Sequence, residues 1–110
     1  MRQGDIIKLD FNPTVGHEQS GYRPAVVVSS NTFNARLGIR LVCPITRTDR
    51  GYPLHIRLDN RTQTTGFIMC EQVKAIDSNA RSASVIERLP PDLLEKVVQY
   101  VTLMFEIDET

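Results

Sequence analysis

Up to residue 86, short segments with apolar side chains at every second position alternate with clusters of Gly, Pro, Asn, Asp and Ser. A two-residue period is typical of strands buried on one face, and the intervening clusters are typical of turns. We expect such strands at residues 5–11, 39–46, 54–58, 67–77 and 83–86. The chain is therefore predicted to be mainly β, with short strands in a strongly bent sheet.

Two features distinguish the strands from one another. Residues 25–29 form an unbroken run, Ala-Val-Val-Val-Ser, which is typical of a central strand covered on both faces. Pro44 interrupts the 39–46 segment and cannot donate a ladder hydrogen bond, so it predicts an edge or a bulge at that point. We expect 25–29 to be the best buried strand and 39–46 to end at a kink beside Thr46.

The C-terminal segment has a different period. Apolar residues at 93, 94, 97, 98, 101, 104 and 105, with Pro91 in the first turn, predict one amphipathic helix over 91–107. Short strands followed by one helix favour a barrel of about five to seven strands closed by a C-terminal helix over a layered α/β fold. A chain of 110 residues has room for one core, so residues 1–110 are predicted to form a single domain.

The charge distribution leaves two readings open. The net charge is zero, which argues against nucleic acid as a partner. Residues 1–70, however, carry nine Lys/Arg against five Asp/Glu, a net charge of +4, while residues 71–110 carry four against eight, a net charge of −4. Either the basic part binds a polyanion, or solvated charges are unevenly sorted by chance.

The cysteines and the N-terminus indicate a reducing compartment. Cys43 and Cys70 lie in apolar segments without His or Cys neighbours at ligand spacing, so we expect small buried hydrophobes and neither a disulfide nor a zinc site. The chain has no run of about 18 apolar residues that could span a membrane, and its first residues lack the apolar stretch of a signal peptide. The protein is predicted to be cytoplasmic.

Seven sequence blocks stand out in order along the chain: residues 4–6, 10–13, 16–27, 44–46, 51–53, 65–66 and 71–77. Together these blocks resemble those of MazF/PemK toxins. The resemblance covers nearly the whole chain and includes the closing helix. It implies an SH3-like barrel, a homodimer, ribosome-independent cleavage of single-stranded RNA at short sequences without a cofactor, and neutralisation by a cognate MazE/PemI-like antitoxin.

Metal-free RNA cleavage sets the chemistry that the residues must supply. The 2′-hydroxyl attacks the adjacent phosphorus, which needs a general base, a group that offsets charge on the phosphorane and a general acid for the leaving oxygen. The sequence offers no Asp/Glu cluster for two metal ions, which supports the metal-free route. We therefore look for these roles among side chains alone.

Four residues are the catalytic candidates. Arg23 is expected to stabilise the phosphorane, because a guanidinium is effectively always protonated; the alternative is a surface arginine stacked on Tyr22. Thr46 matches the family position whose hydroxyl holds the scissile phosphate, unless it only bonds its own backbone. His17 can be base or acid, or simply an exposed loop histidine. Glu18 can orient Arg23 or act as base.

Further residues are candidates for binding RNA. By the resemblance, Glu18 and Gln19 line the site and Gln19 can read a base edge; Ser20 is a further RNA-binding candidate. Arg47, Arg50 and Arg57 flank the site and can contact phosphates along the strand. The alternative for these arginines is a solvated surface charge.

Residues 55, 69 and 71 differ from the catalytic candidates in how they compare with the family. Glu71 matches an aspartate that PemK-like members use in acid–base work, and it is kept as an RNA-binding candidate. Met69 stands where those members have a functional arginine, so Arg23 and Thr46 rank as the central pair. His55 has no partner at metal-ligand spacing and is expected to be a solvent-facing strand residue without a role.

Two functions of other classes compete with the nuclease. A gyrase-poisoning toxin of the CcdB kind shares the barrel-plus-helix architecture and acts by binding a protein. Its activity depends on residues at the extreme C-terminus, where this chain has no Trp, whereas Arg23 with Thr46 favours the nuclease. The third reading is a non-catalytic SH3-like binding module.

Overall fold

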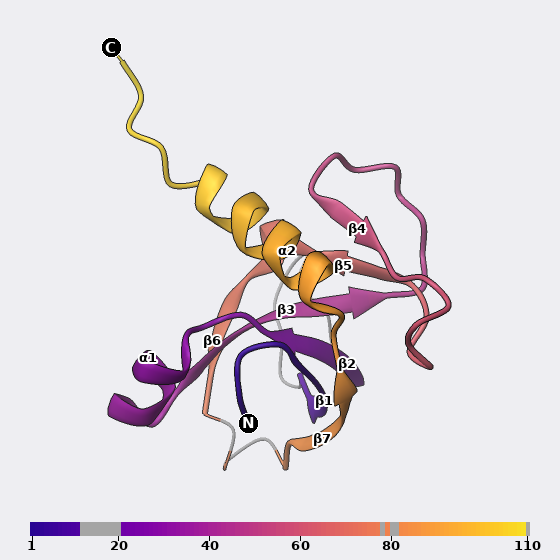
Figure 1. The fold of residues 1–110 in the computed structure, drawn as a ribbon, viewed down its shortest axis with the longest axis vertical. Coiled ribbons are helices and arrows are strands. Elements are labelled where there is room, and N and C mark those ends of the chain that lie inside the picture. The colour runs from indigo at the N-terminus through magenta and orange to yellow at the C-terminus, as the bar shows by residue number, and fades with distance from the viewer. Residues whose placement is uncertain (12–20, 78, 80–81, 110) are drawn as a thin grey trace.

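The computed structural model describes residues 1–11, 21–77, 79 and 82–109. The elements are β1 (Asp5–Asp10), β2 (Tyr22–Val27), α1 (Asn31–Arg36), β3 (Arg40–Thr46), β4 (His55–Arg57), β5 (Phe67–Met69), the 3-10 turn η1 (Cys70–Gln72), β6 (Lys74–Ile76), β7 (Ser84–Arg88) and α2 (Pro91–Leu103). The strands form one sheet in the order β4-β5-β3-β2-β1-β7, and β6 also pairs with β3 (Figure 1). The predicted mainly-β fold with a C-terminal helix is confirmed. In the described residues β4 and β7 are not paired, so the sheet stays open.

The core lies on both faces of β2. Strand β2 runs between β1 and β3, and Ala25, Val26 and Val27 are all completely buried. Val26 joins the cluster beneath α2, which includes Val97, whereas Ala25 and Val27 join a second cluster on the other face. The prediction of a central strand covered on both faces is confirmed, although β2 begins three residues earlier than expected.

Pro44 lies in a central strand, so an edge position is wrong, whereas the alternative prediction, an irregularity in the pairing at Pro44, agrees with the structure. On one side Pro44 is opposite Ala25 of β2. On the other side the partner changes around it, because β6 pairs with residues 40–42 and β5 pairs with residues 45–46. Pro44, which cannot donate a ladder hydrogen bond, therefore lies where the neighbouring strand changes from β6 to β5.

The continuous strand predicted over 67–77 is also wrong, because η1 divides it into β5 and β6. The reason is that its backbone groups have other partners. The Cys70 N–H donates to the carbonyl of Leu54 at 3.2 Å, and the Val73 N–H donates to the carbonyl of Cys70 at 3.4 Å. These bonds turn the chain before it rejoins β3.

The helices differ from expectation at two places. The short helix α1, which was not expected, follows the run at 25–29, and its N-cap Ser30 accepts a hydrogen bond from the Phe33 N–H at 3.1 Å. Helix α2 ends at Leu103 and not at 107, because the Phe105 N–H donates to the Thr102 carbonyl three residues back and so tightens the chain into a turn. None of the described helices is long and apolar enough to cross a membrane.

Candidate functional site: a basic cavity at the ends of β2 and β3

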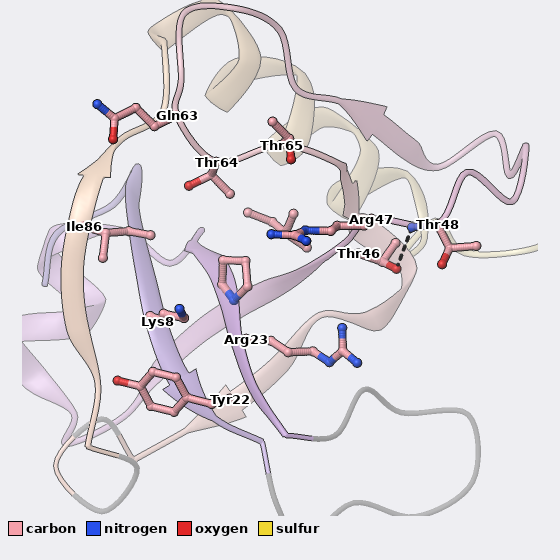
Figure 2. Close-up of a pocket in the computed structure, with 12 residues that line it drawn as sticks. Lys8, Tyr22, Arg23, Thr46, Arg47, Thr48, Gln63, Thr64, Thr65 and Ile86 are labelled. Carbon is pink, nitrogen blue, oxygen red and sulfur yellow. Dashed lines mark hydrogen bonds between the residues drawn. The ribbon is translucent and has the colours of Figure 1, made fainter.

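A cavity of about 380 Å³ opens where β2 begins and β3 ends. Figure 2 shows its lining, with the loop between β4 and β5 above it and β1 and β7 to one side. The lining residues are Lys8, Tyr22, Arg23, Pro24, Ile45, Thr46, Arg47, Thr48, Gln63, Thr64, Thr65 and Ile86. Segments far apart in the sequence therefore form one site.

Sheet register brings Arg23 and Thr46 together. Strands β2 and β3 are antiparallel and pair as far as Ala25 opposite Pro44; Arg23 lies two residues before Ala25, and Thr46 lies two residues after Pro44. Residues two apart on a strand, and residues opposite each other, direct their side chains to the same face of a sheet. In Figure 2 both side chains border the same space. The early start of β2 matters here, because it puts Arg23 on a strand and not in a loop.

Thr46 keeps a donor for a ligand although it also bonds the backbone. It is 4% exposed, and its hydroxyl oxygen accepts a hydrogen bond from the Thr48 N–H at 3.2 Å. The local backbone bond that we considered as the alternative role is therefore present. An accepting hydroxyl can still donate its own proton, so Thr46 can bond a phosphate oxygen in this position.

The cavity is lined by cations. Lys8, Arg23 and Arg47 line it, and none of the described lining residues is Asp or Glu. Lys8 Nζ lies 5.5 Å from the centre of the Tyr22 ring, a cation–π contact. A concave surface lined with one sign of charge concentrates ligands of the opposite sign. The cavity therefore suits an anionic ligand, which favours polyanion binding as the explanation of the basic N-terminal part.

One wall of the cavity is held by Glu87, a residue that sequence reasoning did not single out. Its carboxylate accepts hydrogen bonds from the Gln63 N–H at 3.1 Å, the Thr64 N–H at 2.8 Å and the Thr64 hydroxyl at 2.6 Å. Burial alone would raise the pKa of Glu87, but these hydrogen bonds lower it below its usual value. Strand β7 thus fixes the loop that covers the site.

Replacing Glu87 with Gln should loosen this wall. The amide matches the carboxylate in size but offers one acceptor oxygen instead of two, so one of the three bonds is lost. We expect RNA affinity, measured by fluorescence anisotropy, to fall about threefold to tenfold, as for a typical net hydrogen-bond contribution of about 1 kcal/mol. In the wild type the same loss should appear as pH falls through the lowered pKa of Glu87. Unchanged affinity in the variant would contradict this role.

Two predicted RNA-binding residues lie outside the cavity lining. Arg50 is exposed in the loop between β3 and β4. Glu71 is partly exposed in η1, and its Oε2 lies 2.9 Å from Nε2 of His55. The RNA-binding roles of Arg50 and Glu71 stay predictions.

The expectation for His55 is wrong, because its side chain is only 3% exposed. His55 bonds Glu71 through one ring nitrogen, and its ring centre lies 5.0 Å from that of Tyr52. Strand alternation alone placed it on the solvent side, but η1 covers that side of β4. In the described part of the chain, no three His, Cys, Asp or Glu side chains gather as possible metal ligands.

His17, Glu18, Gln19 and Ser20 lie outside the described residues. Of the remaining predicted site residues, Arg23, Thr46 and Arg47 are brought together. Sequence reasoning missed Lys8 and Tyr22 as lining residues, because Lys8 is an ordinary polar position in the strand predicted at 5–11 and Tyr22 was considered only as a stacking partner of Arg23. The Thr65-Gly66 block was the one signal that the loop between β4 and β5 approaches the site.

Comparisons with known proteins decide the family. Residues 2–105 match the family described as PemK-like, MazF-like toxin of type II toxin-antitoxin system. The chain is 36% identical over 101 residues to the endoribonuclease toxin MazF of Escherichia coli strain K12, covering 92% of this chain and 90% of the relative. The chain belongs to the PemK-like, MazF-like toxin family. It is also 33% identical over 102 residues to the Escherichia coli endoribonuclease PemK, covering 89% of this chain and 77% of that one.

Solved structures of MazF proteins share the fold of this family member. The crystal structure of MazF from Deinococcus radiodurans has a TM-score of 0.88 at 30% identity, covering 94% of each chain. A MazE-MazF structure from the same organism has a TM-score of 0.83 at 27% identity, again covering 94% of each chain. The resemblance first seen in the sequence blocks is therefore confirmed in both sequence and structure.

Proposed function

We propose that this member of the PemK-like, MazF-like family is an endoribonuclease toxin that cleaves single-stranded mRNA at specific short sequences, independently of the ribosome. The observation that carries the proposal is that Arg23 and Thr46 line one cavity together with two further cations. A guanidinium donates two parallel hydrogen bonds to phosphate oxygens, and a neighbouring hydroxyl fixes the orientation of the group. RNA presents that group at every nucleotide.

The proposed reaction is metal-free transfer to the 2′-hydroxyl. The 2′-oxygen attacks the adjacent phosphorus, the bond from phosphorus to the 5′-oxygen breaks, and the products are a 2′,3′-cyclic phosphate and a 5′-hydroxyl. Arg23 stabilises the added negative charge on the non-bridging oxygens, and Thr46 holds the phosphate in line. His17 and Glu18 supply the base and the acid, because Arg23 stays protonated and cannot accept a proton.

Affinity in this proposal comes from residues around the reacting phosphate. Arg47 contacts a neighbouring phosphate, since it lines the cavity beside Thr46. Gln19, Ser20, Arg50 and Glu71 bind the RNA further along. Because such contacts are largely electrostatic, binding should weaken as salt concentration rises.

The biological setting follows from the family. We propose that residues 1–110 act as one toxin domain without a cofactor, in the cytoplasm and as a homodimer. A cognate MazE/PemI-like antitoxin would neutralise it. The gyrase-poisoning function is not favoured, because the relatives are endoribonucleases and the basic cavity has no use in that activity.

A direct test incubates the purified protein with a defined single-stranded RNA in excess EDTA. We expect discrete fragments on a gel and, by mass spectrometry, 2′,3′-cyclic phosphate ends. RNA with a single 2′-deoxynucleotide at the cleaved position should stay intact, because the attacking oxygen is absent. If ordinary RNA also stays intact, the nuclease proposal fails, and inhibition of gyrase becomes the next assay.

Replacing Thr46 with Val tests the role of the hydroxyl. Valine has nearly the same shape, so it keeps the packing, while the hydroxyl is lost both as a donor to phosphate and as the acceptor of the Thr48 N–H. We expect kcat/KM for RNA to fall about 10-fold to 100-fold, the cost of a hydrogen bond to a charged group. Thr46→Ser keeps the hydroxyl and should retain most activity. Equal loss in both variants would point to packing instead of phosphate binding.

A further inference from the structure

A second groove, of about 610 Å³, lies beside the loop between β4 and β5. Its lining residues are Arg47, Arg57, Leu58, Asp59, Asn60, Thr62, Thr65, Gly66 and Phe67. Arg47 and Thr65 also line the first cavity. The two hollows therefore share a wall, and a ligand that leaves the first can continue past Arg47 into the second.

Sheet register extends the row that begins with Arg23 and Thr46. Phe67 of β5 is opposite Thr46 on one side and opposite Arg57 of β4 on the other. Side chains opposed in this way share a face of the sheet. Neighbouring strands are about 4.8 Å apart, so the backbone of Phe67 lies roughly 5 Å and that of Arg57 roughly 10 Å from Thr46. An aromatic ring and a guanidinium thus follow the proposed phosphate site in a fixed order.

Phe67 and Arg57 hold each other only loosely. Phe67 is half-buried, and the guanidinium carbon of Arg57 lies 5.9 Å from the centre of its ring. That separation is at the outer limit of a cation–π contact. Arg57 can therefore move onto a phosphate while the ring face receives a base.

The charge of the groove suits a polyanion. Among the described residues, neither Arg47 nor Arg57 has an ion pair with a carboxylate. The acidic residue among the described lining residues, Asp59, is ion-paired, because its carboxylate lies 2.8 Å from the guanidinium of Arg61, which also pairs with Asp92. Hydrogen bonds from Arg61 lower the pKa of Asp59 to about 2, so this pairing holds at neutral pH. A basic groove with an aromatic platform is what single-stranded nucleic acid requires.

We propose that Phe67 and Arg57 form a second nucleotide subsite, in which Phe67 stacks on the base of a nucleotide next to the cleaved pair and Arg57 binds its phosphate. This inference rests on the proposed function, since it extends the same RNA across the shared wall at Arg47. The second groove thereby lengthens the RNA segment that the enzyme contacts.

The test compares two RNAs that carry a 2′-deoxynucleotide at the position the wild type cleaves. The short one has a single nucleotide on each side of that bond, and the long one has four. The variants are Phe67→Leu and Arg57→Gln, with Arg36→Gln on α1 as the matched surface control. We expect each subsite variant to bind the long RNA about fivefold or more weakly and the short RNA as the wild type does.

Salt dependence separates the two contacts. Arg57→Gln should lower the slope of log affinity against log salt by about 1, because one phosphate contact is lost, whereas Phe67→Leu should leave the slope unchanged. If the wild type binds and cleaves RNA but the variants bind both lengths normally, the subsite is overturned and the proposed function stands. Equal weakening on both lengths also overturns it. If the wild type binds neither RNA, both proposals fail.

Discussion

Replacing Arg23 with Ala is expected to lower kcat/KM for RNA cleavage at least about 100-fold, the cost of removing a preorganised donor or an arginine that stabilises a phosphoryl transition state. Arg23 is exposed on β2 and lines the same cavity as Thr46, so its loss removes charge from the cavity without opening the core. Cleavage of a defined RNA in EDTA, followed with time, measures the effect.

Two further variants make this result specific. Arg23→Lys keeps a positive charge but loses the planar pair of donors, so it should recover only part of the activity. Arg36→Ala removes an exposed arginine from α1, away from both grooves, and should cleave normally. Near-normal cleavage by Arg23→Ala, with the same product ends, would remove Arg23 from the mechanism and direct attention to Arg47.

Replacing Gly66 with Ala is expected to destabilise the fold by about 2 kcal/mol or more and to impair cleavage with it. Gly66 has φ +121, a conformation that L-residues rarely adopt, and an added Cβ would lie 2.2 Å from the carbonyl oxygen of Thr46. The Gly66 carbonyl also accepts the Leu58 N–H at 2.8 Å, which closes the loop between β4 and β5. Relief of the overlap must move either this loop or Thr46.

Two other glycines provide graded controls for this effect in urea or thermal unfolding. Gly51 has φ +65 with open space around it, so Gly51→Ala should cost only the backbone strain, about 1 kcal/mol. A Cβ at Gly38 meets nothing within 4 Å, and Gly38→Ala should be neutral or slightly stabilising. If Gly66→Ala were no worse than Gly51→Ala, the close approach to Thr46 would not constrain the site.

The elements with a strong local signal could be predicted from the sequence. Residues 25–27 of the run at 25–29 form the buried part of β2, because every side chain in the run is apolar or small and either face can pack. The helix beginning at Pro91 follows from its apolar spacing. The resemblance singled out Arg23 and Thr46, because the family motif places both residues at fixed offsets from buried strands.

Elements that depend on non-local partners could not be predicted. Strand alternation made 67–77 one strand and His55 a surface residue, but the turn η1 breaks that strand and supplies Glu71 to His55. The end of α2 at Leu103 was likewise invisible, because the apolar pattern runs on past the last residue of the helix.

The sequence by itself determined the strand-rich composition of the chain, the closing helix, the family and the candidate pair Arg23 and Thr46. Only the tertiary structure decided which other residues surround that pair. Lys8, Glu87 and Phe67 belong to three different strands, and their places near the site follow from sheet register and from a loop held by Glu87. Register is set by long-range pairing and burial, which local patterns of side chains do not encode.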